Sequence, residues 1–381
     1  MYSGIWMYAW DLADEGVDHV LGWAAESGLE ALQIAGAYHA GWFIHPHNPK
    51  HRAYMVEDGC VYFHPHADRY LNTPIKPRVA QVCAQQDWLH AAGERLVKHG
   101  LKMVSWTVCC HNTRLGLLHP ECTVINCFGD HYPHALCPAN NHVRNYILAL
   151  CGDLANNLPM HAIQLESPGY MGLVHGHHHE RDLTVLNSIE QYMMGLCFCD
   201  ACVRVAETKH VDIHHIRHAV RSLLVSAMSH APDRPADYPK SLDELRLQIS
   251  GLSELDTMRS DVENSLIVGI KQAMSPSKAE LFLLGGPNQQ INDAVDVYNS
   301  GAYGQKPDEV LRSTIAARRE IDSAHELYMG IRLGLNSVKD AAELSQIVGA
   351  IRSGGGEGVM FYNYSESPMK ALNWIKAALR A

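Results

Sequence analysis

The feature that most constrains this chain is a repeated alternation of short apolar segments with helical patterns. Strands that are apolar on both faces are typical of a parallel sheet covered by helices. Eight such units in 381 residues close most simply into a (β/α)8 TIM barrel of the α/β class. An open, doubly wound sheet is the alternative, but no GxGxxG motif follows the first strand. The expected strands are residues 4–10, 29–35, 101–108, 162–165, 279–286, 294–299, 327–335 and 358–364.

Two long segments interrupt the regular alternation. A stretch rich in His, Pro and Asn, residues 38–77, predicts a long loop after the second strand. Residues 200–274 read as a series of helices and predict a helical insertion after the fourth strand. We therefore expect one barrel domain over residues 1–381 with this insertion inside it.

The composition limits the kinds of partner that the chain is expected to bind. The formal charge of -10 gives no basic field for a phosphate backbone, so no nucleic-acid partner is expected. The N-terminus lacks the pattern of a signal peptide, and the sequence has no apolar run of about 18 residues. We expect a cytoplasmic protein with no membrane contact. Eleven cysteines, an odd number in a long chain, suit a reducing compartment better than a disulfide framework.

In a barrel, active-site groups lie at the carboxyl ends of the strands and in the loops that follow. In this chain these positions are rich in aromatic and hydrogen-bonding side chains. Sugars pack their C–H faces on aromatic rings, and their hydroxyl groups need polar partners, so the set predicts a site for a carbohydrate or glycoside. The expected substrate-binding residues are Trp10, Tyr38, His39, Trp106, His111, Asn112, Tyr170, Tyr303, Arg332 and Asn363.

Glu166 is the best candidate for catalysis. It directly follows the apolar strand AIQL, where loss of solvation would raise the pKa of a carboxyl group into the range of a general acid. Glycoside hydrolysis usually needs a second carboxylate. Glu366 after the last strand and Asp11 after the first are the available candidates.

Three cysteines stand at metal-ligand spacing. Cys197, Cys199 and Cys202 form a CxCxxC motif, which supplies three soft ligands within one short segment. Tetrahedral zinc needs only one more thiolate or imidazole. The motif predicts a structural zinc site, and the fourth ligand could be Cys137, Cys110, Cys109 or a histidine.

The segments ALCPANNHVRNYILALCGDLANN, AIQLESPGY and CFCDAC together resemble family 42 β-galactosidases and related glycosyl hydrolases. The resemblance implies that Cys137, Cys197, Cys199 and Cys202 hold zinc and that Glu166 is the acid/base. It also suggests a homo-oligomer, a dimer or trimer. Leu165 stands where the family has Asn, and GIRLGLNS offers no counterpart of the strand-7 nucleophile. A distant relative is therefore implied, with an inverting mechanism or Glu366 as partner.

Histidines are abundant, 25 in all, and many lie in expected loops. HGHHHE, residues 175–180, could hold a second, catalytic metal ion together with His39. His178 could instead bind sugar hydroxyl groups. Three function classes follow: a glycoside hydrolase that uses Glu166, a metal-dependent lyase, isomerase or hydrolase acting on a sugar derivative through HGHHHE, and a sugar-binding barrel without catalysis.

Overall fold

The computed structural model describes residues 1–173, 185–231, 233–334 and 337–380. Eight parallel strands form a closed barrel, because β1 pairs with both β14 and β2. The predicted (β/α)8 barrel is thereby confirmed. Its strands, in chain order, are β1 (Tyr2–Met7), β2 (Ala31–Tyr38), β7 (Lys102–Val108), β10 (Ala162–Glu166), β11 (Glu280–Leu284), β12 (Val297–Gly301), β13 (Glu326–Arg332) and β14 (Gly358–Tyr362).

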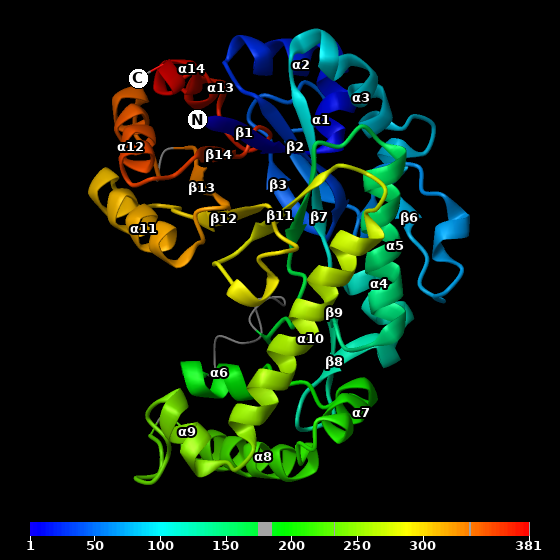
Figure 1. Ribbon diagram of the computed structural model, residues 1–381, viewed down its shortest axis with the longest axis vertical. Coiled ribbons are helices and arrows are strands. Elements are labelled where there is room, and N and C mark those ends of the chain that lie inside the picture. The colour runs from blue at the N-terminus through cyan, green and yellow to red at the C-terminus, as the bar shows by residue number, and fades with distance from the viewer. Residues whose placement is uncertain (174–184, 232, 335–336, 381) are drawn as a thin grey trace.

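Helices surround this barrel (Figure 1). The barrel strands are almost entirely buried, as their apolar sequences require. The helices that accompany the barrel are α1 (Ala9–Glu15), α2 (Val17–Glu26), α3 (Trp88–His99), α4 (Thr113–Leu118), α5 (Asn141–Asn157), α11 (Pro307–Glu320), α12 (Ala341–Ser353), α13 (Met369–Leu372) and α14 (Ile375–Arg380). None of the described helices is long and apolar enough to cross a membrane.

The first strand is shorter than its apolar pattern predicts. It ends at Met7, and α1 begins at Ala9, so Trp10 and Asp11 lie in a helix. The Asp11 carboxylate accepts a hydrogen bond from the Tyr8 backbone N–H at 2.9 Å. A carboxylate at this position satisfies a free amide at a helix start and favours a helix over a longer strand.

The segment after β2 is more ordered than a long loop. It contains an antiparallel hairpin of β3 (Gly41–Ile44) and β4 (Ala53–Val56), and the short strands β5 (Cys60–Val61) and β6 (Arg78–Val79). In the hairpin, Trp42 lies opposite Met55 and both are exposed, while Phe43 and Tyr54 face inward. This alternation is the ordinary pattern of a strand with one covered face.

A second hydrophobic cluster lies beside the barrel core. It joins the hairpin of β8 (Thr123–Ile125) and β9 (His131–Leu136) to helices that follow β10 in sequence. Figure 1 shows α6 to α9 gathered at one end of the molecule, with α10 running from them to the barrel. These helices are α6 (Ser188–Met194), α7 (Asp200–Thr208), α8 (Ile213–Ser229), α9 (Leu242–Gln248) and α10 (Leu252–Ala273).

Candidate active site

A large pocket opens at the carboxyl ends of the barrel strands. Its volume is about 1710 Å³, which exceeds the roughly 300–1,000 Å³ of sites that enclose drug-sized ligands. Seven of the predicted site residues line it: Tyr38, His39, Trp106, His111, Glu166, Tyr303 and Arg332. Further lining residues include Trp6, Trp42, Phe43, Met55, Asp58, His134, Asn299 and Tyr362.

Glu166 lies in this pocket as the last residue of β10. Its Oε2 accepts a hydrogen bond from Trp106 Nε1 at 2.5 Å, across the pairing of β10 with β7. Burial raises the pKa of Glu166, and the bond from Trp106 opposes part of that rise. The next residue, Ser167, has φ of 51°, a conformation that costs energy for a residue with a side chain. The turn after Glu166 is therefore held by its surroundings.

Trp106→Phe is expected to raise the pKa of Glu166 further, because it removes a donor to the ionised carboxylate while it keeps an aromatic ring. Titration of the Glu166 carboxyl carbon by NMR measures the shift. Trp88→Phe is the matched control, since the Trp88 indole donates to Val82 O away from the pocket. An unchanged Glu166 titration in Trp106→Phe would contradict the expectation.

Aromatic rings form the floor of the pocket. Trp106 contacts Trp6, Tyr38 and Tyr362, with ring centroids 6.4, 4.9 and 6.2 Å away. The Arg332 guanidinium lies over the rings of Tyr303 and Tyr362, at 5.5 and 5.6 Å. A rigid aromatic floor beside a cation and a carboxylate suits a ligand with both C–H faces and hydroxyl groups.

One wall of the pocket carries histidines and a second carboxylate. The His39 ring stacks on His111 at 4.1 Å, and His111 contacts His134 edge to face at 6.3 Å. Asp58 lies on the same wall, and its Oδ1 accepts from the Ala40 backbone N–H at 3.3 Å. Burial raises the pKa of Asp58. Among the described lining residues, Asp58 and Glu166 are the carboxylates.

Glu366 lies behind the pocket lining, in the segment that follows β14. Its carboxylate accepts from Asn363 Nδ2 at 2.6 Å, and burial raises its pKa. Both Glu366 and Glu166 raise the pKa values of Tyr38 and Tyr362, behind the larger effect of burial. The two carboxylates therefore act electrostatically on the same pair of tyrosines. Asn363 is buried and supports Glu366 without lining the pocket.

Two residues near the start of the chain, Trp10 and Asp11, are fully buried instead of facing the pocket. The Trp10 ring stacks on Tyr8 at 4.1 Å and on Tyr54 at 5.0 Å. Asp11 accepts from the Ser365 hydroxyl at 2.5 Å. Both differ from the expectation because α1 starts directly after β1 and turns these side chains into the core.

Asn112 and Tyr170 also lie away from the pocket lining. The Asn112 side chain accepts from the Leu115 backbone N–H at 2.9 Å and caps α4. Tyr170 lies beside the cysteines, with its hydroxyl 3.3 Å from Cys202 Sγ. Both residues follow strand ends in sequence, but loop geometry directs them elsewhere. His178 and the HGHHHE segment lie outside the described residues.

Four buried cysteines come together between β9 and α7. The metal-ligand atoms of Cys137, Cys197, Cys199 and Cys202 all lie within 4.8 Å of one another. Cys137 Sγ is 3.8, 3.5 and 3.6 Å from the other three sulfurs in that order. Four sulfurs at about 2.3 Å from one ion, at the corners of a tetrahedron, lie about 3.8 Å apart. The donor set and its spacing therefore fit a tetrahedral metal ion.

Sequence reasoning missed the pocket residues on the β3–β4 hairpin and the turn after it: Trp42, Phe43, Met55 and Asp58. A signal was present, because GWFI and AYMV are short apolar runs with aromatic residues on either side of the turn-forming segment HPHNPKHR. Trp6 and Tyr362 were missed for another reason. They lie within barrel strands, and a strand's sequence alone does not tell which of its faces lines the pocket.

The barrel resembles solved structures of glycoside hydrolases. A β-galactosidase from the psychrophilic Marinomonas ef1 is 11% identical, with a TM-score of 0.58, over 100% of this chain and 59% of that one. The α-L-fucosidase isoenzyme 2 from Paenibacillus thiaminolyticus is 11% identical, with a TM-score of 0.60, over 100% of this chain and 49% of that one. A β-galactosidase from the haloarchaeon Halorubrum lacusprofundi is 12% identical, with a TM-score of 0.60, over 99% of this chain and 57% of that one.

These likenesses define the class of fold, a (β/α)8 barrel of the kind found in glycosidases. The chain spans between about half and three fifths of the length of these structures. No protein-family model matches the sequence, and no curated protein matches it.

Proposed function

We propose that this chain is a glycoside hydrolase that uses Glu166 as its general acid. The observation that carries the proposal is the Glu166 carboxyl group, with a pKa raised by burial, at the end of a barrel strand and above an aromatic floor. A carboxyl group with a raised pKa keeps its proton to higher pH than an ordinary Glu and can give it to a leaving oxygen. The shared barrel fold of glycosidases agrees with this chemistry, and the cysteine motif adds the resemblance to family 42 β-galactosidases.

In the proposed reaction, Glu166 protonates the glycosidic oxygen as the bond from that oxygen to the anomeric carbon breaks. Water supplies a hydroxyl group to the anomeric carbon, and its remaining proton passes to a carboxylate. Arg332 and the rings of Tyr303 and Tyr362 would hold the sugar. We assign the second carboxylate to Glu366, whose side chain hydrogen-bonds to Tyr362 of the pocket lining. Asp58 in the pocket wall is the rival.

The proposal is tested by turnover of a panel of aryl glycosides and oligosaccharides that differ in sugar and anomer. The proposal is supported if the unaltered chain hydrolyses at least one member of the panel and Glu166→Gln does not. Glu366→Gln and Asp58→Asn then identify the second carboxylate by which of them abolishes turnover. Binding of a sugar that survives Glu166→Gln, with no turnover of any member by the unaltered chain, would contradict hydrolysis and favour a sugar-binding barrel.

The size of the pocket favours an oligosaccharide over a single sugar. Trp42 and Met55 line it and are still 66% and 61% exposed, on a hairpin at its mouth. Exposed aromatic and apolar groups of this kind offer a stacking surface for a further sugar ring. We therefore place a distal subsite at the β3–β4 hairpin.

Trp42→Ala is expected to raise KM for a tri- or tetrasaccharide by about 3- to 10-fold, the loss of one stacking contact. KM for a short aryl glycoside should stay within about 2-fold, because this substrate would not reach the hairpin. Steady-state kinetics on both substrates measures the difference. Ile44→Ala is the matched control, since Ile44 is 62% exposed on the same hairpin but lies outside the pocket lining. Equal effects of Trp42→Ala on both substrates would exclude the distal subsite.

We further infer that Cys137, Cys197, Cys199 and Cys202 hold a structural zinc ion. Four thiolates and a closed, buried site are typical of structural zinc, which fixes chain segments without an open coordination position. The ion would join β9 to α7 and stabilise the second hydrophobic cluster.

A further inference from the structure

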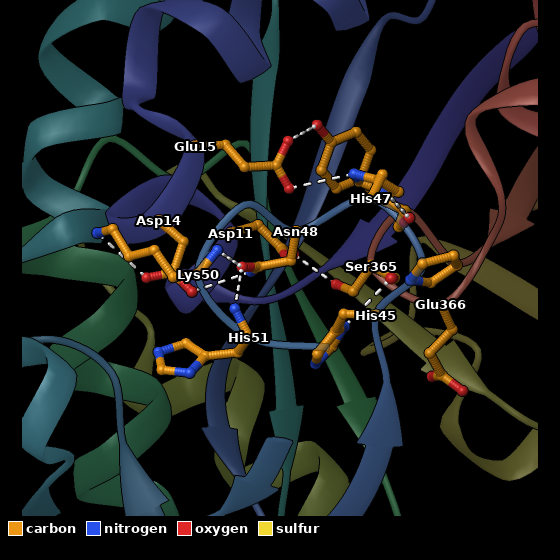
Figure 2. Close-up of polar contacts among 12 residues, drawn as sticks. Asp11, Asp14, Glu15, His45, His47, Asn48, Lys50, His51, Ser365 and Glu366 are labelled. Atoms are coloured by element: carbon orange, nitrogen blue, oxygen red, sulfur yellow. Dashed lines mark hydrogen bonds and ion pairs between the residues drawn. The ribbon is translucent and has the colours of Figure 1, made fainter. Parts of the chain in front are cut away.

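The HPH sequence at residues 45–47 contacts the segment that carries Glu366. His45 Nδ1 lies 3.1 Å from Ser365 O, and His47 Nε2 lies 2.9 Å from Tyr364 O. A carbonyl oxygen only accepts, so each imidazole donates to the backbone. Figure 2 shows both rings beside this segment, with Glu366 pointing away from them.

Helix α1 holds the same segment from another side. Asp11 Oδ2 accepts from the Ser365 hydroxyl at 2.5 Å, and Glu15 accepts from the Tyr364 hydroxyl at 2.7 Å. Glu15 Oε1 also lies 3.3 Å from His47 Nδ1 (Figure 2). The two residues directly before Glu366 are thus held by four side chains from elsewhere in the sequence.

The pKa values of the two histidines shift in opposite directions. Burial lowers the pKa of His45, which favours its neutral form. Burial alone would also lower the pKa of His47, but Glu15 and the Tyr364 carbonyl outweigh it, and the pKa of His47 is raised. Around His47 the ionisable groups are Glu15 and Asp11 of α1, the neighbouring His45, and Tyr364.

Asp11 is the second titrating group of this cluster. Burial raises its pKa to about 7, although the bonds from Ser365 and the Tyr8 backbone oppose the rise. One of its oxygens, Oδ1, is buried without a hydrogen-bond partner among the described residues. An ionised Asp11 would leave this oxygen charged and unsolvated, which is costly. A protonated His47 nearby would lower that cost.

We propose that Asp11, Glu15, His45 and His47 form a clamp that positions Glu366 for catalysis. The inference rests on the proposed function, in which Glu366 is the second carboxylate. These four are positioning residues, because they contact the backbone and side chains before Glu366 and not the pocket. Glu15 contacts both His47 and the Tyr364 hydroxyl, and residues 364 and 365 are hydrogen-bonded from two directions.

His47→Ala is expected to lower kcat about 10-fold or more with KM within about 2-fold, since a misplaced catalytic group loses rate more than binding. Amide hydrogen exchange of residues 364–366 should become faster in the same variant. His47→Gln restores a donor for Tyr364 O without a charge and should recover part of both effects. His51→Ala is the matched control, because the exposed His51 ring contacts Tyr54 and not this segment.

The dependence of hydrogen exchange on pH gives a second test of the clamp. His47 loses its proton as pH rises through its raised pKa, and the ion pair with Glu15 is then lost. In the unaltered chain, protection of residues 364–366, corrected for intrinsic exchange, should therefore decrease over that pH range. In His47→Gln the decrease should be smaller, because only Asp11, with its pKa of about 7, then titrates beside this segment.

Failure of the clamp can be distinguished from failure of the proposed function. If His47→Ala changes neither exchange nor kcat, the clamp is overturned. Faster exchange with unchanged kcat also overturns it, provided that Glu366→Gln abolishes turnover. If Glu366→Gln itself leaves turnover intact, the assignment of Glu366 as second carboxylate fails, and with it a clamp for catalysis.

Discussion

Glu166→Gln is expected to lower kcat on unactivated glycosides by about 10²- to 10⁴-fold, the contribution typical of one general acid–base group. Gln keeps the size of the side chain and can still contact Trp106, but it has no proton to give. The loss should be smaller on aryl glycosides whose leaving group departs without protonation. Steady-state kinetics on a pair of substrates that differ only in leaving group measures this difference.

The dependence of activity on pH tests the same role of Glu166, and its direction can be predicted. A general acid acts only while protonated, so activity should decline as pH rises through the pKa of Glu166. Burial raises this pKa, and the decline should therefore occur at higher pH than for an ordinary Glu. In Glu166→Gln this limb of the profile should disappear.

Glu280→Gln is the matched control for this substitution. Glu280 also has a pKa raised by burial, but it begins β11 at the opposite end of the barrel and pairs with His161 at 3.6 Å. Its replacement should leave kcat within about 2-fold, as expected for a residue remote from the reacting bond. Equal losses in the two variants would point to a general effect on folding and would remove the support for Glu166.

Cys137→Ser is expected to abolish binding of the proposed zinc ion and to destabilise the chain by more than about 4 kcal/mol, as the loss of a metal site can. Cys137 is close to all three other sulfurs, so its removal leaves an incomplete set of ligands. The zinc content of the purified chain, measured by elemental analysis, should fall from one zinc per chain to nearly none. Thermal unfolding measures the accompanying loss of stability.

Cys127→Ser is the matched control for the cysteine site. Cys127 is fully buried in the same second hydrophobic cluster, but it is outside the group of four. Its replacement should cost only about 1–3 kcal/mol, the penalty of a buried hydroxyl group, and should leave the zinc content unchanged. Zinc retained in Cys137→Ser, or absent from the unaltered chain produced with zinc present, would exclude the proposed site.

Much of the candidate site follows from local sequence. Glu166 could be predicted because AIQL ends at a strand terminus and the barrel places such termini at one face. Trp106 and Arg332 follow from the same rule and line the pocket. Trp10 does not line the pocket, because Asp11 favours the start of a helix where the apolar run predicted a longer strand.

Other features depend on contacts between distant parts of the chain. Asp58 reaches the pocket wall only because the β3–β4 hairpin folds over the barrel mouth. Spacing alone left the fourth cysteine open among several candidates, and the family resemblance favoured Cys137. The structure brings Cys137, directly after β9, to the CxCxxC motif. The HPH sequence gave no indication of its contacts with residues 364 and 365.

The sequence by itself determined the (β/α)8 barrel, the placement of Glu166 at a strand end and the spacing of three cysteines. These properties are set by periodicity and by neighbours along the chain. Only the tertiary structure decided which strand-end residues line the pocket, which carboxylates act electrostatically on the same tyrosines, and what holds the segment before Glu366. Such relations depend on how loops of different length fold against one another, and a local pattern carries no information about contacts across more than 300 residues, as between His45 and Ser365.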